Sequence, residues 1–307
     1  MTDDSPENPT APGPLYEQVT DVKARAFLQA MGRPDGQDMV YRISGSVYAH
    51  VPADALAPAL RHGQKLFGLE GYNVRRLFRE PGTDRLHVLT REFACYTDPA
   101  DPARVLREWA NPLDGRIYPV VPINNDAVNL GPFPVGPGFR GFPCREIHGE
   151  WVWSMDIPPR TDLLGTVGDD FGLAGGIYTT MEMFDFYVSA EEARQRAEGL
   201  PYGAMRVKNS WTRSGPWAPF MGLRERETEG GHLVYHARSW SLDSVEEVEP
   251  WLREEAGPLY LSSPEAPGPN QTSWTSFWAK QLGAGELTWA KWCEENGRPQ
   301  PGQETSS

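Results

Sequence analysis

The stretch MVYRISGSVYAH at residues 39–50 alternates large apolar side chains with polar or smaller ones. Met39, Tyr41 and Ile43 occupy every second position, and a period of two is that of a β-strand with one face turned inward. Runs rich in β-branched and aromatic residues recur along the chain, at 72–79, 86–96, 117–123, 146–155, 181–188, 204–211, 221–228 and 233–241. The pattern therefore predicts a mainly β protein.

Turn signals separate these runs at short intervals. Pro81-Gly82 and Asp114-Gly115 stand between predicted strands, and Glu229-Gly230-Gly231 indicates a hairpin between 221–228 and 233–241. Connections this short favour antiparallel pairing, because a parallel pair needs a long crossover. We expect a large antiparallel, barrel-like sheet of the calycin or lipocalin kind, since closure removes exposed edges and leaves room for a small ligand. A β sandwich is the alternative.

Short helices are expected at the periphery of this sheet. An apolar stripe predicts a helix over 21–31, and a Ser189 cap followed by two acids and a closing Gly199 predicts one over 189–199. Acidic helices are expected over 245–255, with a break at Pro250, and over 287–294. Residues 1–16 and 295–307 are rich in Pro, Ser, Glu and Gln and are interpreted as disordered tails. A single β-rich domain is then expected over 17–294.

Composition argues against several classes of partner. A net charge of -13 and a pI near 5.0 disfavour nucleic-acid binding, which depends on basic side chains. No stretch reaches the roughly 18 apolar residues of a membrane helix, and the N-terminus lacks a signal-peptide pattern, so a cytoplasmic protein without a membrane partner is expected. The three widely spaced cysteines indicate neither a disulfide framework nor a zinc site.

Three blocks of the sequence resemble a known family. They are KLFGLEGYNVRRL at 65–77, REFACYTDP at 91–99 and REWANPLDGRIYPVVPINNDAVN at 107–129. Their combination of Tyr-x-Asp-Pro, Trp-x-Asn-Pro and Asn-Asp-x-Val-Asn resembles DUF1838, a bacterial family of unknown function, over most of the folded chain. A Pro commonly follows the Asn-Asp pair in that family, whereas Ala127 follows it here, so the local backbone stiffness differs. The resemblance implies a shared fold and supplies no catalytic residues.

The polar loop that ends the third block is the first candidate site. Asn124, Asn125, Asp126 and Asn129 follow an apolar run, and their amides and carboxylate suit hydrogen bonds to a ligand, with Asp126 as acceptor or base. The alternative is that these side chains satisfy backbone groups in a tight turn.

The run MEMFDFYV at 181–188 holds the second candidate. Glu182 shares a strand face with Phe184 and Phe186, while Asp185 points to the opposite face. One acid therefore has apolar neighbours whichever face is inward, and burial would raise its pKa towards the range useful in catalysis. The alternative is an acid that faces water or pairs with an Arg.

Histidines supply further candidates. His148 and Glu150 are predicted to share a face of one strand, unless this charged segment is simply a polar surface. His232, His236 and Trp240 share a face of another strand, which is either an inward or an outward row. The two His in that row are separated by roughly 13 Å, too far to bind one metal together.

Eleven Trp residues are many for this length. Trp153, Trp211 and Trp240 are expected to line a pocket for an apolar ligand, although core filling is the simpler interpretation of any single Trp. No P-loop, dinucleotide fingerprint, serine elbow or His-Glu-x-x-His motif is present, so neither a nucleotide cofactor nor a metal is expected.

These observations favour a cofactor-independent enzyme that acts on a small, largely apolar molecule, as a lyase, isomerase or cyclase of specialised metabolism. The predicted catalytic residues are Glu182, Asp126 and His148; the predicted substrate-binding residues are Asn125, Asn129, Trp153, Phe184, Trp211, His236 and Trp240. The alternative is a non-catalytic carrier or sensor of apolar small molecules, and a third interpretation is a structural homodimer.

Overall fold

A computed structural model of the chain describes residues 10, 12–52, 56–158, 160–162, 177–197, 206–223 and 228–270. The α-helices are α1 (Gly13–Gln18), α2 (Val22–Met31), α4 (Ala190–Ala197) and α5 (Pro250–Ala256), and the 3-10 turns are η2 (Pro219–Met221), η4 (Val245–Glu247) and η5 (Pro258–Leu261). The strands are β1 (Met39–His50), β2 (Lys65–Arg79), β3 (Arg85–Thr97), β4 (Glu108–Ala110), β5 (Ile117–Pro119), β6 (Ile123–Asp126), β7 (Leu130–Pro134), β8 (Cys144–Ile147), β9 (Glu150–Ile157), β10 (Arg160–Asp162), β11 (Ile177–Thr179), β12 (Met181–Ser189), β13 (Lys208–Gly215) and β14 (His232–Leu242).

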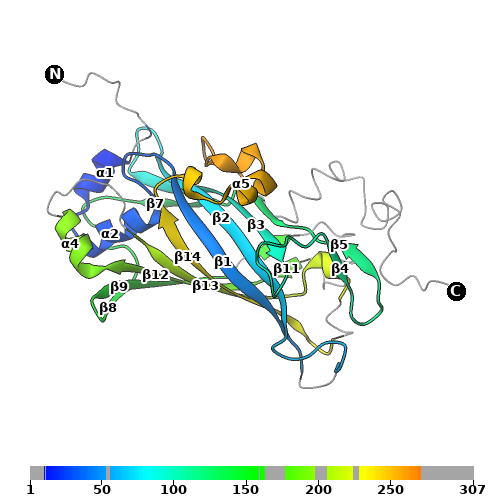
Figure 1. Cartoon of the computed structure of the whole chain (residues 1–307). Coiled ribbons are helices and arrows are strands. Elements are labelled where there is room, and N and C mark those ends of the chain that lie inside the picture. Colours follow the sequence, from blue (N-terminus) through cyan, green and yellow to red (C-terminus); the bar gives the residue numbers. More distant parts are fainter. Residues whose placement is uncertain are drawn as a thin grey trace.

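A ten-stranded sheet organises the described residues (Figure 1). Its order is β6-β3-β2-β1-β14-β13-β12-β9-β8, with β7 also paired to β3, and the pairings between its strands are antiparallel. The alternation of Met39, Tyr41 and Ile43 falls in β1, at the centre of this sheet. The prediction of a mainly β, antiparallel fold is confirmed, while the described strands do not close into a barrel.

The sheet is strongly curved. Tyr96 on β3 and Tyr235 on β14 point from the same face, and their hydroxyl oxygens are 2.9 Å apart. Three strand spacings separate β3 from β14, about 14 Å in a flat sheet, so these side chains meet only because the face they share is concave. Gly45 and Gly71 lie in this bend, where an added Cβ would stand 2.5 Å from the carbonyl oxygen of His236 and 2.3 Å from that of Phe93.

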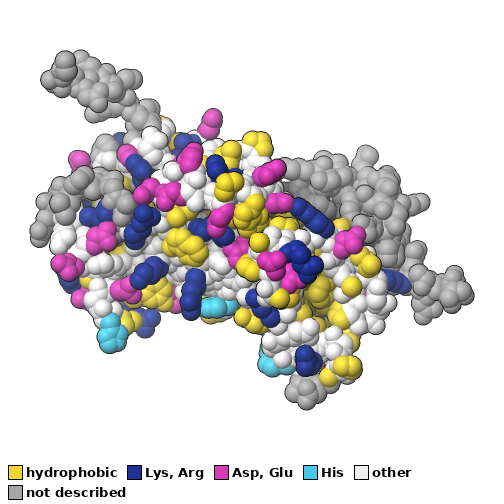
Figure 2. Space-filling view, in the orientation of Figure 1, with side chains coloured by type: hydrophobic (Ala, Val, Ile, Leu, Met, Phe, Trp, Pro, Cys, Tyr) yellow, Lys and Arg dark blue, Asp and Glu magenta, His cyan; other side chains and the backbone are white. Residues whose placement is uncertain are grey.

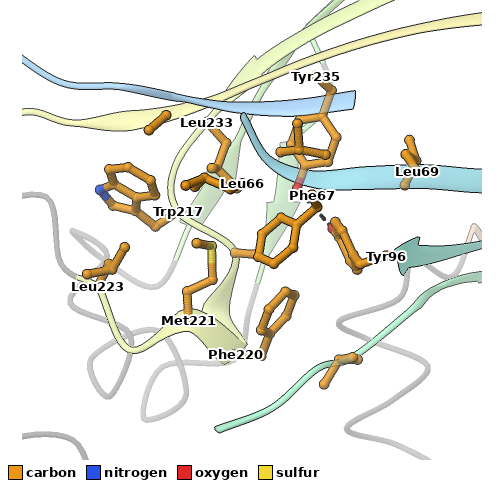
Figure 3. Packing of buried hydrophobic residues seen from close by; sticks show 14 of the residues in the cluster. Leu66, Phe67, Leu69, Tyr96, Trp217, Phe220, Met221, Leu223, Leu233 and Tyr235 are labelled. Carbon is orange, nitrogen blue, oxygen red and sulfur yellow. Dashed lines mark hydrogen bonds between the residues drawn. The ribbon is translucent and has the colours of Figure 1, made fainter. Parts of the chain in front are cut away.

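Two apolar clusters occupy the two ends of the concave inner face. At one end the segment around η2 packs on the sheet, with Trp217, Phe220 and Met221 against Phe67 and Tyr96 (Figure 3). At the other end α2 covers the sheet, and its buried residues contact the inner side chains of β2, β3, β9 and β12. Figure 1 shows α1, α2 and α4 together at this second end.

The outer face of β1, β2 and β3 is covered by α5 and η5. Val40, Val74 and Phe93 pack there against Leu252 and Tyr260. Beside them lies an ion network in which Arg42 and Glu70 are buried and Glu249 is exposed. Arg42 contacts Glu70 at 2.7 Å and Glu249 at 2.7 Å, which ties the segment before α5 to the sheet. None of the helices in the described ranges is long and apolar enough to cross a lipid bilayer.

Several sequence predictions require correction. Residues 219–221 form η2 and residues 222–223 are not in a strand, so the predicted strand over 221–228 is wrong in its described part, and β14 pairs with β13 and β1. The predicted N-terminal tail is too long, because α1 buries Leu15 and Tyr16. The predicted helix over 287–294 and the C-terminal tail lie outside the described residues, whereas the helices over 21–31 and 189–199 and the break at Pro250 are confirmed.

Candidate functional site

Polar side chains lie on the inner face between the two apolar clusters. We call this set the inner belt: Asn73 and Arg75 on β2, Glu92 on β3, Asn125 on β6, Glu182 on β12 and Arg213 on β13. The strand registers place Glu92 opposite both Asn73 and Asn125, and Glu182 opposite Arg213. All of these side chains except Asn73 keep partial exposure to solvent, whereas the clusters at both ends are buried. The inner belt is therefore the charged, water-reachable part of the inner face.

The fold changes the acidity of Glu92, one of the two acids of the belt. Burial, and after it the nearby negative charge of Glu182, raise the pKa of its carboxyl to about 7, against the opposing influence of Arg213 and Arg75. Among the described residues its carboxyl accepts no hydrogen bond, and it remains partly exposed. A free carboxyl that titrates near neutrality can both accept and donate a proton.

The effect of Glu182 on the pKa of Glu92 is a consequence of the curvature of the sheet. Four strands separate β3 from β12 in the sheet order, yet the two carboxyls interact across the concave face. Glu182 is itself held in place: the indole Nε1 of Trp211 donates a hydrogen bond to it at 3.1 Å, and Arg213 lies 3.7 Å away. The guanidinium of Arg213 in turn stacks on Tyr235 at 5.3 Å from the ring centroid.

Arg75 lies diagonally across from Glu92 on the neighbouring strand. Its Nε donates a hydrogen bond to Asn73 Oδ1 at 2.8 Å, and its guanidinium lies 4.0 Å from the ring centroid of Tyr41. Tyr41 is held by α2, because its hydroxyl donates a hydrogen bond to the carbonyl oxygen of Ala30 at 2.7 Å. Burial lowers the pKa of Arg75, although an Arg remains charged at any working pH.

An aromatic wall and a floor of small residues adjoin the belt. Phe184 stacks on Trp211 with ring centroids 6.4 Å apart, and Trp211 contacts Tyr235 at 5.9 Å. Next to Glu92 on the same face, Gly71 and Ala94 pair across β2 and β3. The aromatic wall and the carboxyl of Glu92 together suit a flat organic molecule.

The structure brings four of the predicted site residues to this region. Glu182, Phe184, Trp211 and Asn125 all point to the inner face, and the prediction that Glu182 shares a face with Phe184 and Phe186 is confirmed. Trp153 is also on this face, but it is completely buried in the apolar cluster beneath α2.

The loop acids and amides lie elsewhere. Asp126 is on the outer face, where it accepts a hydrogen bond at 2.8 Å from Arg91, and Arg91 also donates to the carbonyl oxygens of Ser262 and Ser263. The side chain of Asn129 accepts a hydrogen bond from the backbone of Thr90 at 3.1 Å. Both side chains hold the edge of the sheet together.

The histidines also lie away from the belt. His148 is not on a strand, so its predicted place beside Glu150 is wrong: it occupies the exposed two-residue turn between β8 and β9, with a φ of 49° followed by Gly149 at 80°. His236 and Trp240 are exposed on the outer face of β14, which settles that row as outward. The β-turn and the outward register explain why these side chains do not meet Glu182.

Sequence reasoning missed Glu92, Arg75 and Arg213. A signal for Glu92 exists, since it stands at the middle of the alternating series Val88, Thr90, Glu92, Ala94 and Tyr96. The opposite face of β3 also buries apolar residues, Phe93 and Cys95, against the segment that contains α5 and η5, so alternation alone does not distinguish the two faces. Pairing across the concave face depends on curvature, which no local pattern encodes.

The outer surface is mixed in character. Figure 2 shows acidic, basic and apolar side chains intermixed on the face that carries α5. In the part of the chain that the structure describes, no group of three or more His, Cys, Asp or Glu is arranged to hold a metal ion.

Comparison with known proteins identifies the family. A family model described as "Protein of unknown function (DUF1838)" matches residues 36–281, a span that includes every strand of the sheet and the whole inner belt. Neither the curated proteins nor the solved structures contain a match to the chain. With most of its length matched, the chain belongs to the DUF1838 family.

Proposed function

We propose that this protein is an enzyme that moves a proton on a small organic substrate bound at the inner belt, as a lyase, an isomerase or a cyclase that needs neither a metal nor a nucleotide cofactor. The observation that carries the proposal is the carboxyl of Glu92, partly exposed on the inner face and with a pKa of about 7. Such a group is half ionised near neutral pH, where general acid-base catalysis is most effective.

The neighbouring residues have complementary roles in this proposal. Glu92 takes a proton from a carbon or oxygen atom of the substrate and returns it at a second atom. Arg213, oriented by Glu182, stabilises the negative charge that develops on the substrate when the proton leaves. Phe184 and Trp211 hold the apolar body of the substrate, so this body loses freedom before the reaction begins.

Asn125 completes the polar contacts. It pairs with Glu92 across β3 and β6, so its amide lies on the same face and suits a hydrogen bond to a substrate carbonyl or hydroxyl. A specialised metabolic role, a cytoplasmic location and a homodimeric state remain proposals that accompany this assignment.

The first test measures the acidity of Glu92. Protein labelled with ¹³C at the side-chain carboxyl of Glu is titrated by NMR, and the Glu92 resonance is assigned with the Glu92→Gln variant. We expect its midpoint near 7, well above the ordinary value of 4.5. A midpoint close to 4.5 would remove the basis of the proposal.

The second test measures proton transfer directly. Protein in D₂O is incubated with 2-tetralone or phenylacetone, and loss of the C–H signal beside the carbonyl is followed by NMR. We expect acceleration of about 10²-fold or more by the wild type and loss of that acceleration in Glu92→Gln. The matched control is Glu254→Gln, an exposed acid on α5. Equal exchange by Glu92→Gln and wild type contradicts the role of Glu92, and binding without exchange favours the non-catalytic carrier.

A further inference from the structure

Among the described residues, Arg75 is the basic residue of the inner belt without a carboxylate in direct contact. Within the described ranges, Arg42, Arg91 and Arg213 each lie within 4 Å of a carboxylate, at 2.7, 2.8 and 3.7 Å. No carboxylate of the described residues lies at such a distance from Arg75, whose Nε donates to an amide oxygen and whose plane stacks on an aromatic ring. Arg75 also keeps partial exposure to solvent on the inner face.

A cation held in this position has a cost for the folded protein. Removing a guanidinium from bulk water is unfavourable unless a negative charge or several hydrogen bonds replace the lost solvation. Asn73 and Tyr41 hold Arg75 in one orientation without neutralising it. A residue fixed in this way is pre-organised for an anion that arrives with the ligand.

The charge balance of the belt agrees with this interpretation. Its ionisable groups are Arg75, Arg213, Glu182 and Glu92, and Glu182 is the acid next to Arg213. When Glu92 carries its proton, the belt has one positive charge in excess, located at Arg75. We propose that the substrate carries a carboxylate, which pairs with Arg75 while the apolar body lies over Glu92 and against the aromatic wall.

The proposal rests on the proposed function, because it takes the inner belt as the substrate site, and it adds the class of substrate: a small organic acid with an aromatic or cyclic body. Arg75 and Glu92 are diagonal neighbours on β2 and β3, so a carboxylate on Arg75 places the adjacent carbon atoms of the substrate beside Glu92. Arg75 is thus a substrate-positioning residue.

Binding of a carboxylate ligand is expected to be coupled to the uptake of a proton by Glu92. The groups that act on Glu92 are Glu182 from β12, Arg213 from β13 and Arg75 from β2. A ligand anion beside Arg75 offsets the cation that favours ionised Glu92, so Glu92 retains its proton more readily in the complex. Carboxylate binding is therefore expected to strengthen as the pH falls from about 8 to about 6.

The experiment compares two probes of nearly equal shape, 3-phenylpropanoate and its neutral amide, 3-phenylpropanamide. Each is titrated into ¹⁵N-labelled full-length protein, and NMR follows the Arg75 Nε–H and the Trp211 indole N–H. We expect the carboxylate to shift both signals and to bind about 10-fold or more tightly than the amide, since each factor of ten corresponds to about 1.4 kcal/mol. Calorimetry in two buffers of different ionisation enthalpy is expected to show proton uptake.

Variants test the residue itself. Arg75→Met is expected to remove the preference for the carboxylate, with a smaller effect on binding of the amide, while Arg75→Lys retains part of the preference because it keeps the charge. The control Arg238→Met changes an exposed Arg on the outer face of β14 and is expected to behave as the wild type. The comparison of the two probes on the wild type does not depend on whether a variant folds.

Three outcomes would overturn the inference: equal affinity for both probes, no shift of either signal by either probe, or a preference that persists in Arg75→Met. The proposed function is judged separately, by the titration of Glu92 and by deuterium exchange into ketones that carry no carboxylate. If deuterium exchange depends on Glu92 but the protein does not prefer the carboxylate probe, the proposed enzyme function stands and the proposal of an organic-acid substrate is rejected.

Discussion

Replacing Glu92 by Gln removes the titrating group of the inner belt and nearly preserves the shape of the side chain. The effect of this change on stability is therefore expected to depend on pH. A carboxyl whose pKa is higher in the folded than in the unfolded protein binds more protons in the folded state between the two values. The wild type accordingly loses stability as the pH rises from about 4.5 to about 7, and it does not regain that stability at higher pH.

The magnitude follows from the same two values. The difference between about 7 and 4.5 is about 2.5 pH units, and at 1.36 kcal/mol per unit the ionised Glu92 costs about 3 kcal/mol. Glu92→Gln lacks this cost. Relative to the wild type, the variant is expected to gain about 3 kcal/mol in the free energy of unfolding between about pH 4.5 and about pH 8.

Urea denaturation followed by Trp fluorescence, at several pH values across this range, measures the two free energies of unfolding. A constant change in stability caused by the amide itself does not alter how the difference between the two free energies varies with pH. Glu254→Gln, an exposed change on α5, is the matched control and should show no such slope. A difference between Glu92→Gln and wild type that stays constant within about 0.5 kcal/mol from about pH 5 to about pH 8 would refute the reasoning.

The remaining predictions concern the outer network, the buried Trp and the histidines. Arg42→Ala leaves Glu70 buried without its cation and is expected to cost about 3–5 kcal/mol by urea denaturation, whereas Arg33→Ala, which breaks an exposed ion pair, should cost less than about 1 kcal/mol. Trp153→Ala empties a completely buried site and is expected to cost about 3–5 kcal/mol, against a change within about 0.5 kcal/mol for Trp240→Ala at an exposed position. The pKa of His50 is lowered by burial and by the neighbouring His232 and His62, so its contribution to stability is present above about pH 6.5 and is lost as the pH falls. Replacing His62 and His232 by Gln should weaken this acid dependence of the melting temperature, and His148→Gln, in an exposed turn, should not; an unchanged dependence in the double variant would contradict the coupling.

Local patterns in the sequence were sufficient for the class of fold. The sequence alternates in 39–50, 181–188 and 233–241 because successive side chains of a strand point to opposite faces of the sheet. This pattern does not depend on which strand lies alongside. The short helices over 21–31 and 189–199 are equally local, because their caps and apolar stripes lie within a few turns of chain. The face shared by Glu182, Phe184 and Phe186 was predictable for the same reason.

Tertiary structure decided which faces are inward and which residues meet. His236 and Glu182 both stand in alternating strands, yet one is outward and the other inward, because register and cover assign the faces over long distances along the chain. The carboxyls of Glu92 and Glu182 interact only because the sheet curves over the six strands from β3 to β12. Chain order places these two carboxyls far apart, and only the assembled, curved sheet buries Glu92 and brings Glu182 close enough to raise its pKa to about 7.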